Sequence, residues 1–219
     1  MKDKILVVAV HPDDETLGCG GTLLKHKAKG DKVHWLICTN LNKNHSYHVK
    51  REKEIQKVSK LFNFDSVHQL KFETKKIDHY SISQIIDEIS KVIKYLKPNT
   101  IYLPFKEDIH TDHKKIFEAA YSCTKSFRFK YINKIYMMET LSETEFSPST
   151  MESTFIPNTF VDISKYINKK VQIMKIYKSE IDNHPFPRSE TSIKALASFR
   201  GSSSGCKFAE SFVLLKEIK

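Results

Sequence analysis

Apolar runs alternate with amphipathic stretches through the first half of the chain, a pattern that predicts strands and helices in turn. Residues 4–10 form a continuous apolar run rich in β-branched side chains, which is typical of a buried strand. Residues 82–96 place apolar side chains at the spacing of one helix face. The predicted strands cover residues 4–10, 33–38, 67–70 and 100–103. The predicted helices cover residues 20–30, 48–62 and 82–96. This order predicts an α/β fold with a mostly parallel central sheet covered on both faces.

The second half of the chain continues with shorter predicted elements around a polar loop that reaches residue 153. Its predicted helices cover residues 113–122, 164–181 and 190–198. Its predicted strands cover residues 135–138, 159–161 and 212–215. No internal repeat and no linker long enough to separate two units interrupts this succession. Residues 1–219 are therefore predicted to form a single domain.

The composition is that of an ordinary globular protein, with 40% hydrophobic and 28% charged residues. The apolar run near the start is too short for the hydrophobic region of a signal peptide, and no later run is long enough to cross a bilayer. We therefore expect a cytoplasmic protein. The four cysteines, Cys19, Cys38, Cys123 and Cys206, are far apart and include no C-x-x-C pair. This spacing favours reduced thiols, so any metal is expected to be held by histidine and carboxylate.

The formal net charge of +10 raises the question of a nucleic-acid partner. The lysines, however, are scattered through every segment and far outnumber the arginines, and no basic stripe is interleaved with aromatic residues. This pattern favours a solvated basic surface, so no nucleic-acid partner is expected. A phosphorylated or nucleotide-linked sugar would also be attracted by such a charge.

The first candidate site follows the first predicted strand directly and reads His11-Pro12-Asp13-Asp14-Glu15. Ligands of open α/β sheets bind at the carboxyl ends of the strands, where these side chains are expected. Three successive carboxylates repel one another unless a cation lies among them, which favours a metal over a simple helix cap. Histidine and carboxylate both bind zinc, and a carboxylate that is not a ligand can deprotonate the attacking water. A dinucleotide site is excluded, because Leu23 stands where the third glycine is required and the acids would repel pyrophosphate.

The second candidate site, residues 108–113, follows another predicted strand and precedes a helix. It contains His110 and His113 with Asp112 between them, and Asp108 before them. These residues supply an imidazole ligand, a carboxylate to orient it, and a second imidazole for an oxyanion. Because both clusters follow strands, they are expected to converge at one edge of the sheet.

These motifs resemble the PIG-L/LmbE-type de-N-acetylases, zinc hydrolases that remove acetyl groups from N-acetylglucosamine-containing substrates. The family pattern A-H-P-D-D-E stands here as residues 10–15 with Val10 in place of alanine, and P-x-x-x-D-x-H-x-D-H stands as residues 104–113. Further similarities lie at Arg51 and Glu54 and in residues 161–164, 200–201 and 209–212. The resemblance implies a Rossmann-like three-layer fold, and many family members are oligomers.

The resemblance also implies a role for each residue. His11, Asp14 and His113 would bind zinc, and Asp13 would be the general base. His110, held by Asp112, would polarise the amide carbonyl. Arg51 falls where family members place a substrate-binding arginine.

Other pocket residues are less clearly marked by the sequence. His184, Arg188 and Arg200 are candidates to line the pocket, although ordinary loop anchoring explains them equally well. The family often has Thr-x-Gly after its second strand, where this chain has Thr39-Asn40-Leu41, so the substrate need not be that of the relatives.

The sequence therefore predicts a zinc-dependent deacetylase acting on a small N-acetylglucosamine-like molecule that is free, nucleotide-linked or glycan-linked. Fe²⁺ and Co²⁺ are alternative metals, because two imidazoles and a carboxylate suit several divalent ions. One rival function is deformylation, or cleavage of another amide on a sugar or thiol conjugate. The other is a basic glycan- or nucleic-acid-binding module that merely retains a metal site.

Overall fold

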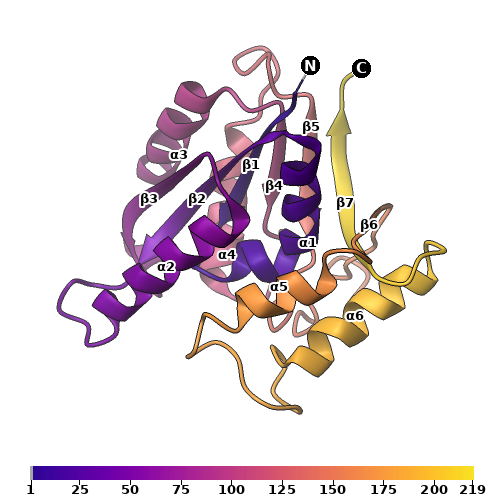
Figure 1. Ribbon diagram of the computed structural model, residues 1–219. Helices are drawn as coiled ribbons and strands as arrows, with labels where there is room; N and C mark the ends of the chain where they lie inside the picture. The colour runs from indigo at the N-terminus through magenta and orange to yellow at the C-terminus, as the bar shows by residue number, and fades with distance from the viewer. Residues whose placement is uncertain (1) are drawn as a thin grey trace.

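A seven-stranded sheet forms the centre of the computed structural model, which describes residues 2–219 (Figure 1). Its strands lie in the order β3-β2-β1-β4-β5-β7-β6. The neighbouring pairs β3-β2, β2-β1, β1-β4 and β4-β5 are parallel. Strand β7 runs antiparallel to both of its neighbours, β5 and β6. The strands are β1 (Lys4–Ala9), β2 (Lys32–Asn40), β3 (Ser66–Glu73), β4 (Thr100–Leu103), β5 (Lys134–Met138), β6 (Thr159–Asp162) and β7 (Ala209–Glu217). The predicted α/β fold with a mostly parallel sheet is confirmed.

Helices cover both faces of the sheet, and β1 shows why its sequence is apolar throughout. Ile5, Val7 and Ala9 pack on one face, with side chains of α1, α2, α5 and α6. The alternate residues of β1 pack on the other face, with side chains of α3 and α4. A strand buried on both faces needs no polar alternation. The helices are α1 (Asp14–Lys29), α2 (His48–Phe62), α3 (Ile82–Leu96), α4 (Thr111–Ser122), α5 (Ile167–Met174) and α6 (Glu190–Ser202), with a 3-10 turn η1 (Ile77–His79).

The strand order reverses at β1. The chain passes from β1 through β2 to β3 on one side, and then crosses to β4 on the other side of β1. The loops that follow β1 and β4 therefore leave adjacent strand ends in opposite directions and open a crevice between them. Both predicted motifs lie in these two loops and in the first turns of the helices that follow them, so the fold brings residues about a hundred positions apart to one edge of the sheet.

Four predicted helices have different limits in the structure, and two of them differ by more than four residues at one end. The helix predicted from residue 20 begins at Asp14 and is kinked at Cys19, which has non-helical dihedral angles. The helix predicted for residues 164–181 is wrong at both ends, since α5 covers only Ile167–Met174. The segment that follows α5 instead runs without regular structure to α6 and supplies residues to the crevice.

Glu210 of β7 explains how α1 tolerates its kink. The kink frees backbone N–H groups, and the Glu210 carboxylate accepts hydrogen bonds from Gly21 N at 2.8 Å and Thr22 N at 2.7 Å. Lys170 of α5 donates to the same carboxylate at 2.7 Å, and both side chains are buried. A buried ion pair is stable only when further hydrogen bonds support it, and here Lys170 also donates to the Leu17 backbone oxygen at 2.8 Å. This contact ties α1, α5 and β7 together behind the crevice.

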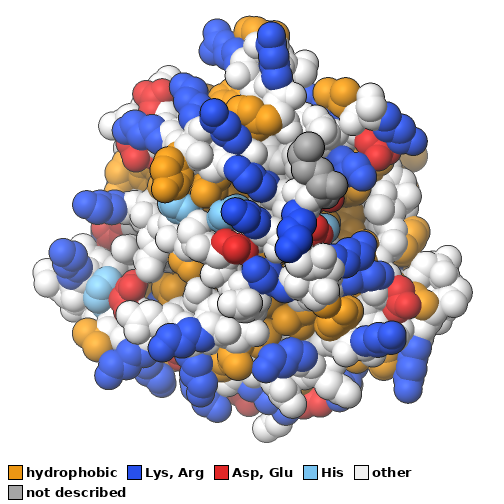
Figure 2. Space-filling model, turned by 45° about the horizontal axis from the view of Figure 1, so that its top comes forward, with side chains coloured by type: hydrophobic (Ala, Val, Ile, Leu, Met, Phe, Trp, Pro, Cys, Tyr) orange, Lys and Arg blue, Asp and Glu red, His pale blue; other side chains and the backbone are white. Residues whose placement is uncertain are grey.

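The positive charge is spread over the surface. Figure 2 shows lysine and arginine side chains distributed over one face with acidic side chains among them. Within residues 2–219, no helix is long and apolar enough to cross a membrane.

The Glu210→Gln variant should lose about 3–5 kcal/mol of unfolding free energy, because Lys170 would be left buried without its partner charge. Urea denaturation checks this. Glu88→Gln, which removes the exposed partner of Lys91 on α3, is the matched control and should not move the urea midpoint measurably. Equal midpoints for Glu210→Gln and the unmodified protein would contradict the assignment.

Candidate metal and hydrolase site

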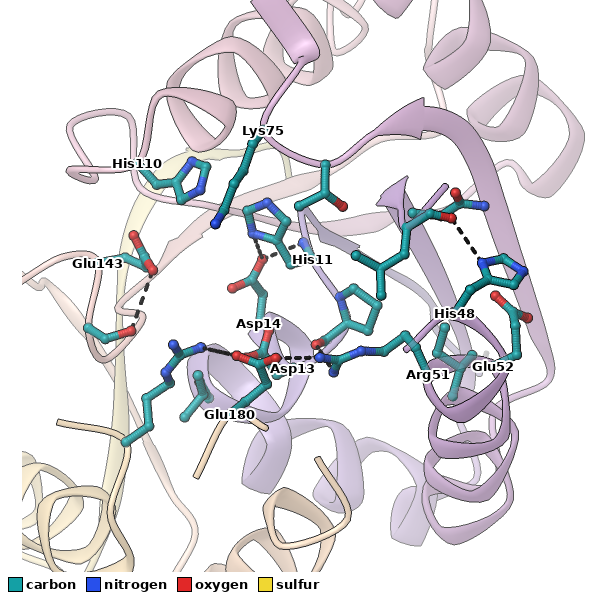
Figure 3. Close-up of a pocket in the computed structure, with 18 residues that line it drawn as sticks. His11, Asp13, Asp14, His48, Arg51, Glu52, Lys75, His110, Glu143 and Glu180 are labelled. Carbon is teal, nitrogen blue, oxygen red and sulfur yellow. Dashed lines mark hydrogen bonds and ion pairs between the residues drawn. The ribbon is translucent and has the colours of Figure 1, made fainter. Parts of the chain in front are cut away.

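The two motifs meet in a cavity of about 300 Å³ at the carboxyl ends of the strands. Figure 3 shows His11 from the loop after β1 and Asp14 from the start of α1 beside His110, with Arg51 and His48 of α2 across the cavity. The lining residues are His11, Pro12, Asp13, Asp14, Leu17, Asn40, Leu41, His48, Arg51, Glu52, Ile55, Thr74, Lys75, His110, Ser142, Glu143, Glu180 and Arg188.

His11, Asp14 and His113 can hold a metal ion, since one ligand atom of each lies within 4.8 Å of the others. His113 is fully buried, and its Nε2 has no hydrogen-bond partner among the described residues, although it lies 3.4 Å from Asp14 Oδ2. Leaving a buried ring nitrogen without a partner is costly, unless a ligand such as a metal uses its lone pair. This orphaned atom fits a metal.

In His113 and His11, a carboxylate lies beside the ring nitrogen that is not proposed to bind the metal. His113 Nδ1 lies 2.8 Å from Asp108 Oδ2, and His11 Nε2 lies 3.3 Å from Asp112 Oδ2. Thr144 donates to the other oxygen of Asp108 at 2.6 Å and fixes its orientation. A carboxylate on the far ring nitrogen is the usual support of a metal-binding histidine, because it selects the tautomer whose inner nitrogen is free.

A second set, His11, His110 and Asp112, is also close enough to hold a metal. Two of its atoms are already engaged, however. His110 Nδ1 accepts the Asp112 backbone N–H at 3.1 Å, and Asp112 Oδ2 accepts the Lys75 N–H at 2.9 Å. The first set, with its unused buried nitrogen, fits a metal better.

The site's electrostatics also favour a cation among these carboxylates. Although burial opposes it, His113 and His11 hold the pKa of Asp14 below its usual range. Burial also works against the charged form of His113, yet Asp14 and Asp108 raise the pKa of this imidazole well above its usual value. Both shifts show that the acids around His113 stabilise positive charge at this point.

Asp13 lies next to the cluster in a strained conformation. Its φ of 134° is one that few residues other than glycine adopt, and such strain is concentrated at functional sites. Its carboxylate is buried and accepts a hydrogen bond from Arg188 at 2.9 Å. Burial and the nearby Asp14 raise the pKa of Asp13, and Arg188 opposes this rise.

Glu180, which the sequence did not identify, connects two arginines at the cavity wall. It accepts hydrogen bonds from Arg188, at 3.1 Å, and from Arg51. Arg51 also donates to the backbone oxygen of Pro12 at 3.3 Å, next to Asp13. The two arginines thus serve first to hold Asp13 and its loop. No sequence pattern marks Glu180. The helix predicted for residues 164–181 did not place it at the cavity.

His110 caps α4, and its contacts correct one expectation. We expected the Asp112 carboxylate to hold His110, but it contacts His11, and the Asp112 backbone N–H holds His110 instead. Asp112 lies in the first helical turn, where its backbone N–H meets the capping residue while its carboxylate contacts His11. Since Nδ1 of His110 accepts this hydrogen bond, a neutral ring carries its proton on Nε2. Burial and the neighbouring His11 lower the pKa of His110 to about 4, so the ring is neutral.

Of the four residues suggested for substrate binding, Arg51 and Arg188 line this cavity, whereas His184 and Arg200 do not. His184 is exposed in a separate hollow beside α6. Arg200 makes two hydrogen bonds to Glu139, at 2.9 and 2.5 Å, and therefore anchors α6 to the end of β5.

Besides Glu180, the sequence also missed Lys75 and Glu143, which line the cavity. Burial raises the pKa of Glu143 to about 7.

Comparison with known proteins identifies the family. The sequence profile described as GlcNAc-PI de-N-acetylase matches residues 6–124, more than half of the chain, and includes both motifs. The chain belongs to the GlcNAc-PI de-N-acetylase family.

Three proteins similar to this family member align with 94% or more of this chain. A diacetylchitobiose deacetylase of Thermococcus kodakarensis is 22% identical and aligns over 94% of this chain and 81% of its own length. The crystal structure of a conserved protein from Thermus thermophilus has 25% identity and a TM-score of 0.80, covering 100% of this chain and 97% of the other. The hydratase GalB of Pseudomonas putida is only 15% identical, yet covers 100% of this chain and 98% of its own with a TM-score of 0.76. The fold alone therefore does not determine the reaction, and the site residues must.

Metal-free protein should bind one Zn²⁺ per chain, and Asp108→Asn should weaken binding by about 10- to 100-fold, because His113 would lose its orienting carboxylate. Equilibrium dialysis against Zn²⁺ measures both values. His184→Ala is the control and should bind as the unmodified protein does. Unchanged binding in His113→Ala would rule out the proposed ligand set.

Proposed function

We propose that this chain is a zinc-dependent hydrolase that removes the acetyl group from the nitrogen of a small amino sugar. The observation that carries the proposal is the buried His113 Nε2, which has no hydrogen-bond partner within residues 2–219 and faces Asp14 and His11, with the Asp13 carboxylate next to them. The deacetylase names of the relatives support the same reaction class. We retain as proposals a single domain over residues 1–219, a cytoplasmic location and assembly into a homo-oligomer.

His11, Asp14 and His113 would hold the metal, and Fe²⁺ or Co²⁺ also suits this donor set. When bound, a divalent metal supplies a Lewis acid that polarises a carbonyl and lowers the pKa of water. The three ligands leave room for substrate, which is typical of catalytic rather than structural zinc sites. The remaining steps belong to side chains of the chain itself.

Asp13 is the general base in this proposal. Its carboxylate takes a proton from the water that attacks the amide carbon, and the hydrogen bond from Arg188 keeps it ionised and oriented. The neutral His110 donates its Nε2 proton in a hydrogen bond to the carbonyl oxygen, where negative charge develops. Asp13 then returns its proton to the departing amine as the C–N bond breaks.

Asp13→Ala should reduce the turnover number by about 10²- to 10⁴-fold while zinc stays bound, since Asp13 is not among the proposed ligands. Release of free amine from N-acetylglucosamine derivatives, assayed beside zinc content, measures both effects. His113→Ala is the contrasting variant and should lose zinc and activity together. If Asp13→Ala also lost its zinc, Asp13 would have to be reassigned as a ligand.

The same assay separates the rival functions. A deformylase would release amine faster from N-formyl than from N-acetyl amino sugars. A binding module would release none, and it would bind its polyanion with a steep salt dependence.

Activity should fall as the pH decreases, because Asp13 must be ionised and its pKa is raised by burial and by Asp14. Arg188 lowers that pKa, so Arg188→Met should move the acid limb of the profile of kcat/KM to higher pH. Metal-loaded protein should be used throughout, and Arg200→Met is the control, since Arg200 lies outside the cavity. An acid limb that stays in place, or moves to lower pH, in Arg188→Met would contradict this role.

A further inference from the structure

Lys75 is held against the cavity by the turn that follows β3. Its backbone N–H donates to Asp112 Oδ2 at 2.9 Å, which ties the turn to the histidine cluster. The next contacts join the turn to the end of β2: Thr74 N donates to the Asn40 oxygen at 3.0 Å, and Thr74 Oγ1 donates to Thr39 at 3.2 Å. The backbones of Asn40, Thr74 and Lys75 are therefore joined along one wall of the cavity, where Asn40 and Thr74 are half-buried and Lys75 is exposed.

The Lys75 side chain points into this cavity. Figure 3 shows it extending from the turn toward the space beside His11 and His110. Among the described residues, its ammonium group makes no ion pair within 4 Å, whereas the adjacent Lys76 is paired with Glu73 at 2.8 Å. The side-chain amide of Asn40 likewise makes no hydrogen bond within residues 2–219.

The other cations of the cavity are already neutralised. Arg188 contacts Asp13 and Glu180, and Arg51 contacts Glu180. Asp14 belongs to the proposed metal cluster. Lys75 is therefore the cavity cation, within residues 2–219, that no carboxylate holds.

Two further acids restrict where an anion can lie. Glu52 projects from α2 and accepts a hydrogen bond from Gln69 at 3.3 Å, and Glu143 stands on the loop after β5. Neither lies within ion-pairing distance of Lys75. The Glu52 carboxylate repels a negative group, and Glu143, whose pKa burial raises to about 7, does so once it is ionised; both favour placement of the anion at the wall of Asn40, Thr74 and Lys75.

A free ammonium and a free amide together suit a phosphate or carboxylate group, because both donate hydrogen bonds and one carries charge. The cavity volume lies at the lower end of the range for small-molecule sites, which fits one sugar with a small substituent. This wall includes Asn40 and borders Leu41, where the sequence departs from the Thr-x-Gly of many family members.

We propose that Asn40, Thr74 and Lys75 form a subsite for an anionic group, a phosphate or a carboxylate, on the amino sugar that the cavity binds. The inference rests on the proposed deacetylase function and names the class of substrate. The acyl nitrogen lies at the histidine cluster, and the anionic substituent lies at Lys75.

Binding of deacetylated products tests the subsite without any turnover. Calorimetry with zinc-loaded protein should compare methyl glucosaminide, carboxymethyl glucosaminide and glucosamine 1-phosphate. At least one anionic ligand should bind about tenfold more tightly than the neutral one, as expected for a charge-assisted hydrogen bond. The preferred anion distinguishes phosphate from carboxylate. Lys75→Met should abolish the preference, Lys75→Arg should retain most of it, and Lys76→Met should leave it unchanged.

Equal binding of all three ligands by the unmodified protein, or a preference that survives in Lys75→Met, would overturn the subsite. A second, kinetic experiment uses the N-acetylated forms of the same three ligands as substrates. Lys75→Met should raise KM for the anionic substrate about tenfold more than for the neutral substrate, with little change in kcat. Absence of amine release from every substrate would contradict the proposed function, whereas the binding comparison would still decide the subsite.

Discussion

The site depends on carboxylates buried around one histidine. Asp108 and His113 are fully buried and Asp14 nearly so, which in a low-dielectric interior demands compensating positive charge. A protonated His113 would supply one charge, but its Nε2 makes no hydrogen bond to Asp14 at 3.4 Å. A divalent cation would satisfy Asp14, His11 and His113 together. The kinked helix α1, the Thr144 contact and the β1–β4 crevice all position these groups.

The motifs made this cluster predictable, because each is contiguous and directly follows a strand. Parallel pairing of β1 with β4 then brings the two loops together without further information. The sequence could not show which partner each side chain would take. Asp112 contacts His11 instead of His110 because of its direction in the first turn of α4, which is a property of three-dimensional packing.

Features that depend on segments without regular secondary structure, or on a kink within a helix, were not predictable from the sequence. Periodicity placed residues 175–181 in a helix, whereas α5 ends at Met174 and the following segment carries Glu180 to the two arginines. The start of α1 was missed for a similar reason: its kink at Cys19 is stabilised by Glu210, nearly two hundred residues away. Such contacts leave no local pattern in the sequence. Arg200, chosen by resemblance, anchors α6 to Glu139 and shows that a matching residue need not face the cavity.

The ion pairs of the cavity distinguish the cations that support the proposed general base from the cation proposed to bind the substrate. Arg188 and Arg51 are neutralised by Asp13 and Glu180, so they maintain the general base and its loop. Lys75, on the opposite side of the histidines, is left to meet the substrate. The wall with Arg51 and Arg188 thus orients the general base, and the wall with Lys75 selects the anionic substituent of the sugar.

The most direct test is a crystal structure of zinc-soaked protein with anomalous diffraction measured on both sides of the zinc absorption edge. The account predicts one strong peak within bonding distance of His11, Asp14 and His113, at about 2.0–2.2 Å from their nitrogen and oxygen atoms. A peak bound instead by His11, His110 and Asp112, or no peak in the cavity, would contradict it.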